Sequence, residues 1–168
     1  MTDTATPTSG DASRPRIHVP IHLRWGDLDA YNHVNNTAML KLLEEARVRA
    51  FWKDEDGPEA PSTAVLDASV GSGLLTLIAR QEIVYLQPVP YQRRPLDVQM
   101  WFGKVGGSSL EVCYDICGPA ESLPQALYAR AVTVVVKVDA ATGAPVRFNA
   151  EERAAFEQYL DEPLSLRR

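Results

Sequence analysis

The sequence predicts an α+β fold in which a largely antiparallel sheet packs against one long helix. Residues 17–25 alternate between apolar and polar side chains, as in a strand with one buried face. Residues 37–53 repeat apolar side chains at helical spacing. Four further strand-like segments follow between residues 73 and 138, and a short helix comes last. The order β-α-β-β-β-β-α is typical of a helix layer on a sheet.

The first strand, residues 17–25, has an apolar face and a polar face. Pro20 cannot donate a hydrogen bond to a neighbouring strand, so we expect it at an edge of the sheet or on an unpaired side of the strand. His18 and His22 are expected to be exposed. The apolar face is predicted to be buried and consists of Ile17, Val19, Ile21, Leu23 and Trp25.

The long helix is predicted over residues 37–53. Asn35 or Asn36 can cap its N-terminus, and Gly57 with Pro58 is a typical stop signal. Apolar side chains surround much of the helix, which predicts deep burial. Glu44 and Arg47 are three residues apart, and we expect them to form an ion pair on the helix surface.

The later strands are predicted over residues 73–87, 96–104, 110–116 and 125–138. The first of them is largely apolar on both faces, more than one helix can cover. Residues 105–108, Val-Gly-Gly-Ser, predict a hairpin turn. Asn149 and Glu152 have the spacing of a capping box for the final helix. Alternation predicts that the second and third strands bury Leu96, Val98, Met100, Phe102, Leu110, Val112, Tyr114 and Ile116.

Length and composition predict one domain over residues 17–160, with tails at 1–16 and 161–168. Residues 1–16 have no apolar core of a secretory signal and are polar enough to predict disorder. The formal charge of −5 argues against a nucleic-acid partner, and no apolar run is long enough to span a membrane. Cys113 and Cys117 lie about 13 Å apart along one strand, too far to form a disulfide. Reduced cysteines are simplest in a cytoplasmic protein.

The stretch between the first strand and the long helix concentrates polar side chains at one helix N-terminus. Its first N–H groups lack intrahelical acceptors and, with the helix dipole, favour negative charge. A carboxylate beside such donors can attack a carbonyl whose developing oxyanion the donors stabilise. Residues 27–36 are Asp27-Leu28-Asp29-Ala30-Tyr31-Asn32-His33-Val34-Asn35-Asn36.

This motif, followed by Glu44-Glu45-Ala46-Arg47 on the helix, resembles the 4-hydroxybenzoyl-CoA thioesterase branch of the hotdog-fold acyl-CoA thioesterases. By pattern of elements the resemblance covers about residues 17–159. It implies a sheet wrapped around one central helix. It also implies hydrolysis of a fatty or aromatic acyl-CoA to free acid and CoA. The implied reaction uses no metal and no redox cofactor, and coenzyme A enters only as part of the thioester substrate.

The resemblance also implies roles for individual residues. Asp29 would be the catalytic nucleophile or the general base, and the sequence does not choose between these; its alternative role is to close the loop as an Asx turn. His33 and Asn35 would orient Asp29 or the attacking water, although His33 is about as well explained by a structural role. The backbone N–H of Asn36 would bind the thioester carbonyl, with Thr37 as a second donor, and Tyr31 would contact the substrate.

Four more expectations concern the neighbourhood of this motif. Asp27 is more simply a structural carboxylate that binds loop N–H groups. Asn32 occupies a position that suggests a left-handed backbone, which Asn tolerates. Arg93 and Arg94 form a basic loop that either binds the phosphates of coenzyme A or is solvated surface. The apolar strand 73–87 predicts a homodimer or homotetramer.

Two other classes of function fit the same sequence. The first is a non-catalytic acyl-CoA-binding hotdog protein, for which we see no attached DNA-binding module. The second is a hotdog dehydratase, which would use a His/Asp loop of a different pattern that we do not find here.

Overall fold

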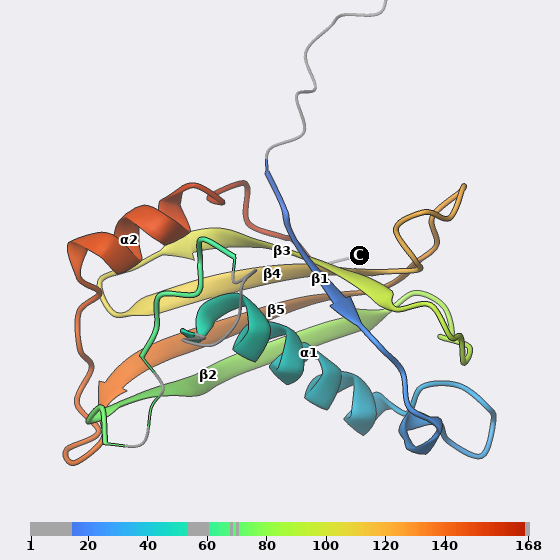
Figure 1. Cartoon of the computed structure of the whole chain (residues 1–168), viewed down its shortest axis with the longest axis horizontal. Helices are drawn as coiled ribbons and strands as arrows, with labels where there is room; N and C mark the ends of the chain where they lie inside the picture. The colour runs from blue at the N-terminus through green and yellow to red at the C-terminus, as the bar shows by residue number, and fades with distance from the viewer. Residues whose placement is uncertain (1–14, 54–60, 68, 70, 167–168) are drawn as a thin grey trace, which may run out of the picture.

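The structure is a computed structural model, and it describes residues 15–53, 61–67, 69 and 71–166. All five strands form one antiparallel sheet in the order β1-β3-β4-β5-β2. The long helix α1 lies against one face of this sheet, with β1 and β2 on either side of it (Figure 1). The predicted α+β fold, a sheet around one central helix, is confirmed.

The elements follow the predicted order, with a short 3-10 turn, η1, between the first strand and the helix. Their bounds are β1 Ile17–Ile21, η1 Trp25–Asp27, α1 Asn36–Phe51, β2 Leu74–Tyr85, β3 Leu96–Val105, β4 Ser109–Cys117, β5 Leu127–Asp139 and α2 Ala150–Glu157. The predicted N-terminal tail (apart from Pro15 and Arg16) and the predicted stop at Gly57 and Pro58 lie outside the described residues.

The first strand is shorter than predicted. It ends at Ile21, and the prediction that Trp25 is buried is wrong, because 70% of Trp25 is exposed. The cause is local: the backbone N–H of Arg24 donates to Oδ2 of Asp27 at 2.7 Å and turns the chain into η1. Pro20 lies on an edge strand, as its missing N–H predicts.

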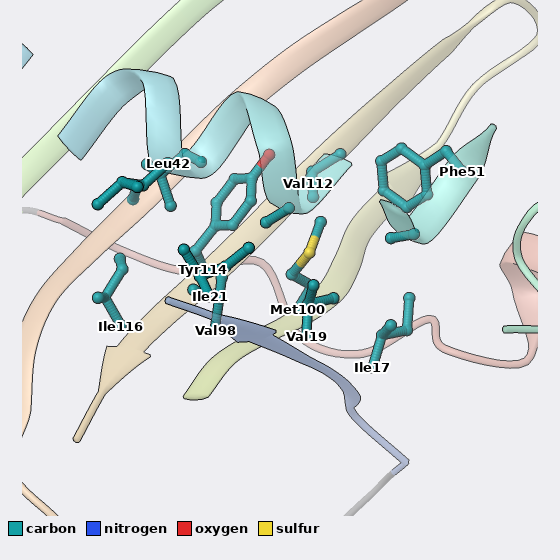
Figure 2. Close-up of a cluster of buried hydrophobic side chains, with 14 of the residues drawn as sticks. Ile17, Val19, Ile21, Leu42, Phe51, Val98, Met100, Val112, Tyr114 and Ile116 are labelled. Carbon is teal, nitrogen blue, oxygen red and sulfur yellow. The ribbon is translucent and has the colours of Figure 1, made fainter. Parts of the chain in front are cut away.

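The main core lies between α1 and the sheet. On the helix, Leu43, Ala46 and Ala50 are fully buried. Figure 2 shows the side chains of β1, β3 and β4 that face α1, with the hydroxyl of Tyr114 directed toward the helix. The eight side chains predicted to be buried on β3 and β4 are all 0–1% exposed.

The opposite face of the sheet carries a smaller cluster formed by Trp101, Cys113 and Val132. Leu164 and Leu166, from beyond the predicted domain boundary, pack against it. The Nε1–H of Trp101 donates to the carbonyl of Glu162 at 3.0 Å. Residues 161–166 thereby cover this part of the sheet.

The two cysteines are buried and are not bonded to each other, as their spacing predicts. Burial raises the pKa of Cys113. Burial, with Asp115 and Asp97 nearby, raises the pKa of Cys117 to about 11. Both thiols are therefore protonated near neutral pH and are poor nucleophiles.

Strand β2 is the second edge of the sheet, and it exposes large apolar side chains. Leu75, Leu77 and Ile78 are 50%, 49% and 43% exposed. The strand pairs only with β5 within the described part of the chain. An exposed apolar edge of this kind is what proteins usually cover.

The short helix α2 closes one end of the sheet. Asn149 and Glu152 form the predicted capping box, with both bonds at 2.8 Å. Glu152 also accepts hydrogen bonds from Nζ of Lys137 at 2.7 and 2.9 Å in a buried ion pair. Among the described residues, neither helix is long and apolar enough to cross a membrane.

Candidate active site

The Asp29 carboxylate closes the loop that precedes α1. Its Oδ1 accepts the backbone N–H groups of Tyr31 at 2.8 Å and of His33 at 3.2 Å. The backbone N–H of Asp29 donates to the carbonyl of His33 at 2.8 Å. Asn32, at the tip, has a φ of 67°, so the predicted left-handed backbone is confirmed. The Asx turn that we considered as an alternative role is present.

That turn uses only one of the two carboxylate oxygens of Asp29. No donor among the described residues reaches Oδ2. The side chain is neither fully buried nor fully exposed. The turn therefore fixes the carboxylate while leaving one oxygen free for another partner, and a structural and a chemical role are compatible.

The start of α1 is capped by Asn35. Its Oδ1 accepts the backbone N–H of Thr37 at 2.9 Å and the Thr37 hydroxyl at 2.7 Å. Oδ1 of Asn36 lies 2.9 Å from the same N–H. The expectation that the Thr37 N–H is a free donor is therefore wrong, because the caps occupy it.

The N–H of Asn36 remains available. Within the part of the chain that the structure describes, it has no hydrogen-bond acceptor. The first N–H of a helix has no intrahelical partner, and the cap here serves the second one. Asn36 thus presents a free backbone donor at the positive end of the helix dipole, seven residues after Asp29.

Asp27 has a structural position. It is 5% exposed and binds the backbone N–H and the guanidinium of Arg24, the latter at 3.1 Å. Its carbonyl accepts the N–H of Asn35 at 2.8 Å. This agrees with the predicted structural role, and it fixes the distance between the end of β1 and the start of α1.

A distant segment, residues 88–95, lies beside the motif. The N–H of Val34 donates to the carbonyl of Val89 at 2.9 Å, and His33 forms a β-bridge with Pro90. The rings of Trp25 and Tyr91 meet edge-to-face at 5.5 Å. The segment that carries the predicted Arg93 and Arg94 is thereby held against the motif.

The other predicted site residues have side chains that are exposed or make no hydrogen bond to a described residue. Tyr31 is 81% exposed, and Arg93 and Arg94 are exposed. His33 is half-buried, and its imidazole makes no hydrogen bond to any described residue. Only the backbone of His33 takes part in the turn, which leaves its ring free to meet a ligand or water.

Tyr85 is a neighbour of the site that the sequence did not reveal. Its hydroxyl donates to the carbonyl of Asn36 at 3.3 Å. Burial raises its pKa, so the hydroxyl stays protonated as a donor. Tyr85 ends β2 and lies 49 residues from Asn36 in the sequence, so no local pattern predicts this contact.

A cavity of about 700 Å³ lies along α1. Its buried lining is apolar except for Arg47 and includes Leu42, Leu66 and Val135. Its exposed lining carries charged side chains, namely Arg24, Lys41, Glu44, Glu45 and Arg49. Its lining includes Arg24, which pairs with Asp27 of the motif, but not Asp29, His33 or Asn36. A cavity of this size is typical of small-molecule sites.

The predicted ion pair between Glu44 and Arg47 does not form. Arg47 turns inward, is 8% exposed and donates through Nη1 to the hydroxyl of Tyr114 at 3.3 Å. The surface ion pair of this helix joins Arg49 to Glu45 at 2.8 Å. The interpretation failed because position 47 lies on the buried side of α1, beside Leu43, Ala46 and Ala50.

A family comparison matches residues 23–156 to the thioesterase-like superfamily. The chain belongs to this superfamily. The match includes the whole motif, α1 and the four strands β2 to β5, but not β1. No curated protein matches the sequence.

Several solved structures share the fold. A proposed thioesterase from Pseudomonas aeruginosa is 30% identical, with 83% of this chain and 95% of that chain covered and a TM-score of 0.65. A proposed acyl-CoA thioesterase from Xanthomonas campestris is 26% identical, with 79% and 98% covered and a TM-score of 0.59. The DHNA-CoA thioesterase from Staphylococcus aureus is 13% identical, with 85% and 89% covered and a TM-score of 0.65. At 13% identity, this last likeness is evidence for the fold alone.

Proposed function

We propose that this member of the thioesterase-like superfamily hydrolyses acyl-CoA thioesters, with Asp29 as the reacting carboxylate. One observation carries the proposal. A carboxylate with one free oxygen and a helix-terminal N–H without an acceptor belong to the same short motif. Hydrolysis of a thioester requires both a nucleophile or base and a donor for the carbonyl oxygen.

In the proposed reaction the thioester carbonyl accepts the N–H of Asn36. As the carbonyl carbon is attacked, its oxygen gains negative charge, which this donor and the helix dipole stabilise. Expulsion of the CoA thiolate breaks the carbon–sulfur bond, and the thiolate then takes up a proton. Tyr85 supports the donor indirectly, because its hydroxyl binds the carbonyl of the same residue.

Asp29 can supply the attack in two ways. As a nucleophile, its Oδ2 bonds to the carbonyl carbon and gives a mixed anhydride, which water then opens to the free acid and the regenerated carboxylate. As a general base, it takes a proton from water while the water oxygen bonds to the carbon. His33, next to the turn, would orient the water in either route, and Asn35 would hold the helix start in position.

The coenzyme part of the substrate would meet the segment 88–95. Arg93 and Arg94 are exposed there, and the contact of Val34 with Val89 holds this segment beside the motif. Guanidinium groups suit phosphate oxygens. The proposal includes no metal ion and no redox cofactor, and the working unit is a homodimer or homotetramer that covers β2.

The test is release of CoA thiol from a panel of aliphatic and aromatic acyl-CoAs, with and without EDTA. We expect hydrolysis of at least part of the panel at an unchanged rate in EDTA. Activity that EDTA abolishes and zinc restores would contradict the metal-independent mechanism. Tight binding of acyl-CoA with no hydrolysis would instead identify a non-catalytic binding protein.

A further inference from the structure

The buried guanidinium of Arg47 is the least compensated charge in the core. Its side chain lines the cavity along α1, whose buried lining is otherwise apolar. Arg47 is 8% exposed, whereas the other cations of the cavity lining, Arg24, Lys41 and Arg49, are all exposed. Burial of an ionised group without a partner of opposite charge is costly.

No such partner is present in the described chain. Arg24 pairs with Asp27 and Arg49 pairs with Glu45, but no described carboxylate forms an ion pair with Arg47. Its one hydrogen bond goes to the hydroxyl of Tyr114 at 3.3 Å. Since a guanidinium has five N–H donors in a fixed fork, most of its hydrogen-bonding capacity is left for something in the cavity.

The buried neighbours of Arg47 do not supply the missing charge, and the two carboxylates of the cavity lining, Glu44 and Glu45, are exposed and form no ion pair with it. Tyr114 is fully buried, and burial raises its pKa, so the phenol stays neutral. Thr133 lies close to the same hydroxyl, and its own Oγ1 is buried without a hydrogen-bond partner in the described residues. Arg47 is charged, whereas Tyr114 and Thr133 are neutral, so this cluster of three side chains contains no anion.

The position of Arg47 suits the far end of an acyl group. It follows Asn36 by eleven residues along α1, which corresponds to about 16 Å along the helix axis. The cavity extends from Arg24, beside the motif, to this cluster. Asp29 and Asn36 do not themselves line the cavity, so an acyl group bound by its carbonyl at the helix N-terminus would enter it beside Arg24 and run along α1 to reach Arg47.

We infer that the preferred acyl groups carry a carboxylate at their far end, which pairs with Arg47. This inference rests on the proposed thioesterase function and names its substrate class. A carboxylate matches the guanidinium fork with two parallel hydrogen bonds. The phosphates of coenzyme A are too bulky and too strongly hydrated for a buried apolar pocket, and the exposed arginines are available to them.

The first test compares matched substrates on the unmutated protein. Each monothioester of a linear dicarboxylic acid is paired with the simple acyl-CoA of equal chain length, over a series of lengths. We expect kcat/KM to favour the carboxylated member by at least about tenfold at the best length, the value of one well-formed charged contact. Equal or higher values for the simple acyl-CoAs at every length would overturn the inference but leave the proposed function standing.

The second test uses variants. Arg47→Met should abolish the preference for the carboxylated substrate while retaining hydrolysis of the simple one, and Arg47→Lys should keep part of the preference. Arg130→Met, on the outer face of the sheet where Arg130 pairs with Asp115, is the control and should leave the ratio unchanged. If Arg47 is only structural, Arg47→Met lowers stability and slows both substrates by the same factor.

A binding measurement separates this inference from the proposed activity. Octanoate should raise the melting temperature of the unmutated protein more than octanol does, because only octanoate carries a carboxylate that can pair with Arg47, and Arg47→Met should remove that difference. A protein that hydrolyses no thioester but shows this difference would refute the proposed function and retain the anion site. A protein that hydrolyses thioesters without this difference would refute the anion site alone.

Discussion

Substitutions of Asp29 can separate its role in the loop from its proposed role in chemistry. Asn at this position keeps an oxygen that can accept the N–H groups of Tyr31 and His33, whereas Ala removes it. The two lost hydrogen bonds, each worth about 0.5–1.5 kcal/mol, predict that Asp29→Ala lowers the free energy of unfolding by about 1–3 kcal/mol. Asp29→Asn should lower it by less than about 1 kcal/mol.

The effect on turnover should not follow the same order. An amide is a poor nucleophile and a poor base, and general acid–base catalysis alone contributes about 10²–10⁴-fold. Both variants should therefore lose at least about 100-fold in kcat, which corresponds to about 2.7 kcal/mol of transition-state stabilisation, and both should still bind acyl-CoA.

The assay pairs thermal or urea unfolding with initial rates of CoA release. Near-normal turnover by Asp29→Asn would refute the chemical role. Equal loss of stability in the two variants would refute the claim that Oδ1 holds the turn.

Other predictions concern the frame around the site. Asp27→Asn should lower the free energy of unfolding by about 1–3 kcal/mol, measured by urea titration. It should reduce kcat, measured from initial rates, less than Asp29→Asn does; a larger reduction would assign the chemistry to Asp27. Lys137→Met should cost about 3–5 kcal/mol by leaving the buried Glu152 carboxylate without its cation. Adding Glu152→Gln, which removes the charge but keeps an acceptor for the Asn149 N–H, should restore much of it; a double variant no more stable than the single one would contradict this. Leu77→Asp should dissociate the predicted oligomer in sedimentation, and an unmutated protein that is an active monomer at micromolar concentration would refute the oligomer itself. Cys117, whose pKa is raised to about 11, should react with a disulfide reagent at pH 8 only after unfolding, because about one thiol in a thousand is ionised there; fast labelling of the native protein would contradict its burial.

Most of the fold was predictable because its signals are local and periodic. Strict alternation identified the buried faces of β3 and β4, and Asn149 with Glu152 marked the start of α2. The left-handed Asn32 was also predictable, since few residue types tolerate that backbone. These features depend on residues close together in the sequence.

Two wrong predictions arise where a side-chain hydrogen bond competes with a regular backbone pattern. Trp25 continues the alternation of the first strand, but the bond between Arg24 and Asp27 turns the chain first. Thr37 was expected to have a free N–H, but the cap satisfies it. In both cases a polar side chain within three residues overrides the regular pattern.

The sequence also did not reveal how α1 is rotated against the sheet or which residues far apart in the sequence meet. Glu44 and Arg47 have the spacing of a surface ion pair, but the rotation of α1 against the sheet sends Arg47 inward to Tyr114. Tyr85 reaches the start of α1 from 49 residues away. Neither contact leaves a local signal, since each depends on how the helix is seated on the sheet.

Hydrolysis that depends on Asp29 is tested most directly by comparing the progress curves of CoA release by the unmutated protein and by Asp29→Asn, at a substrate excess of many equivalents. We expect many turnovers by the unmutated protein on at least one acyl-CoA and release at least about 100-fold slower by the variant. Equal curves for the two proteins, or no release by the unmutated protein from any acyl-CoA that it binds, would contradict this expectation.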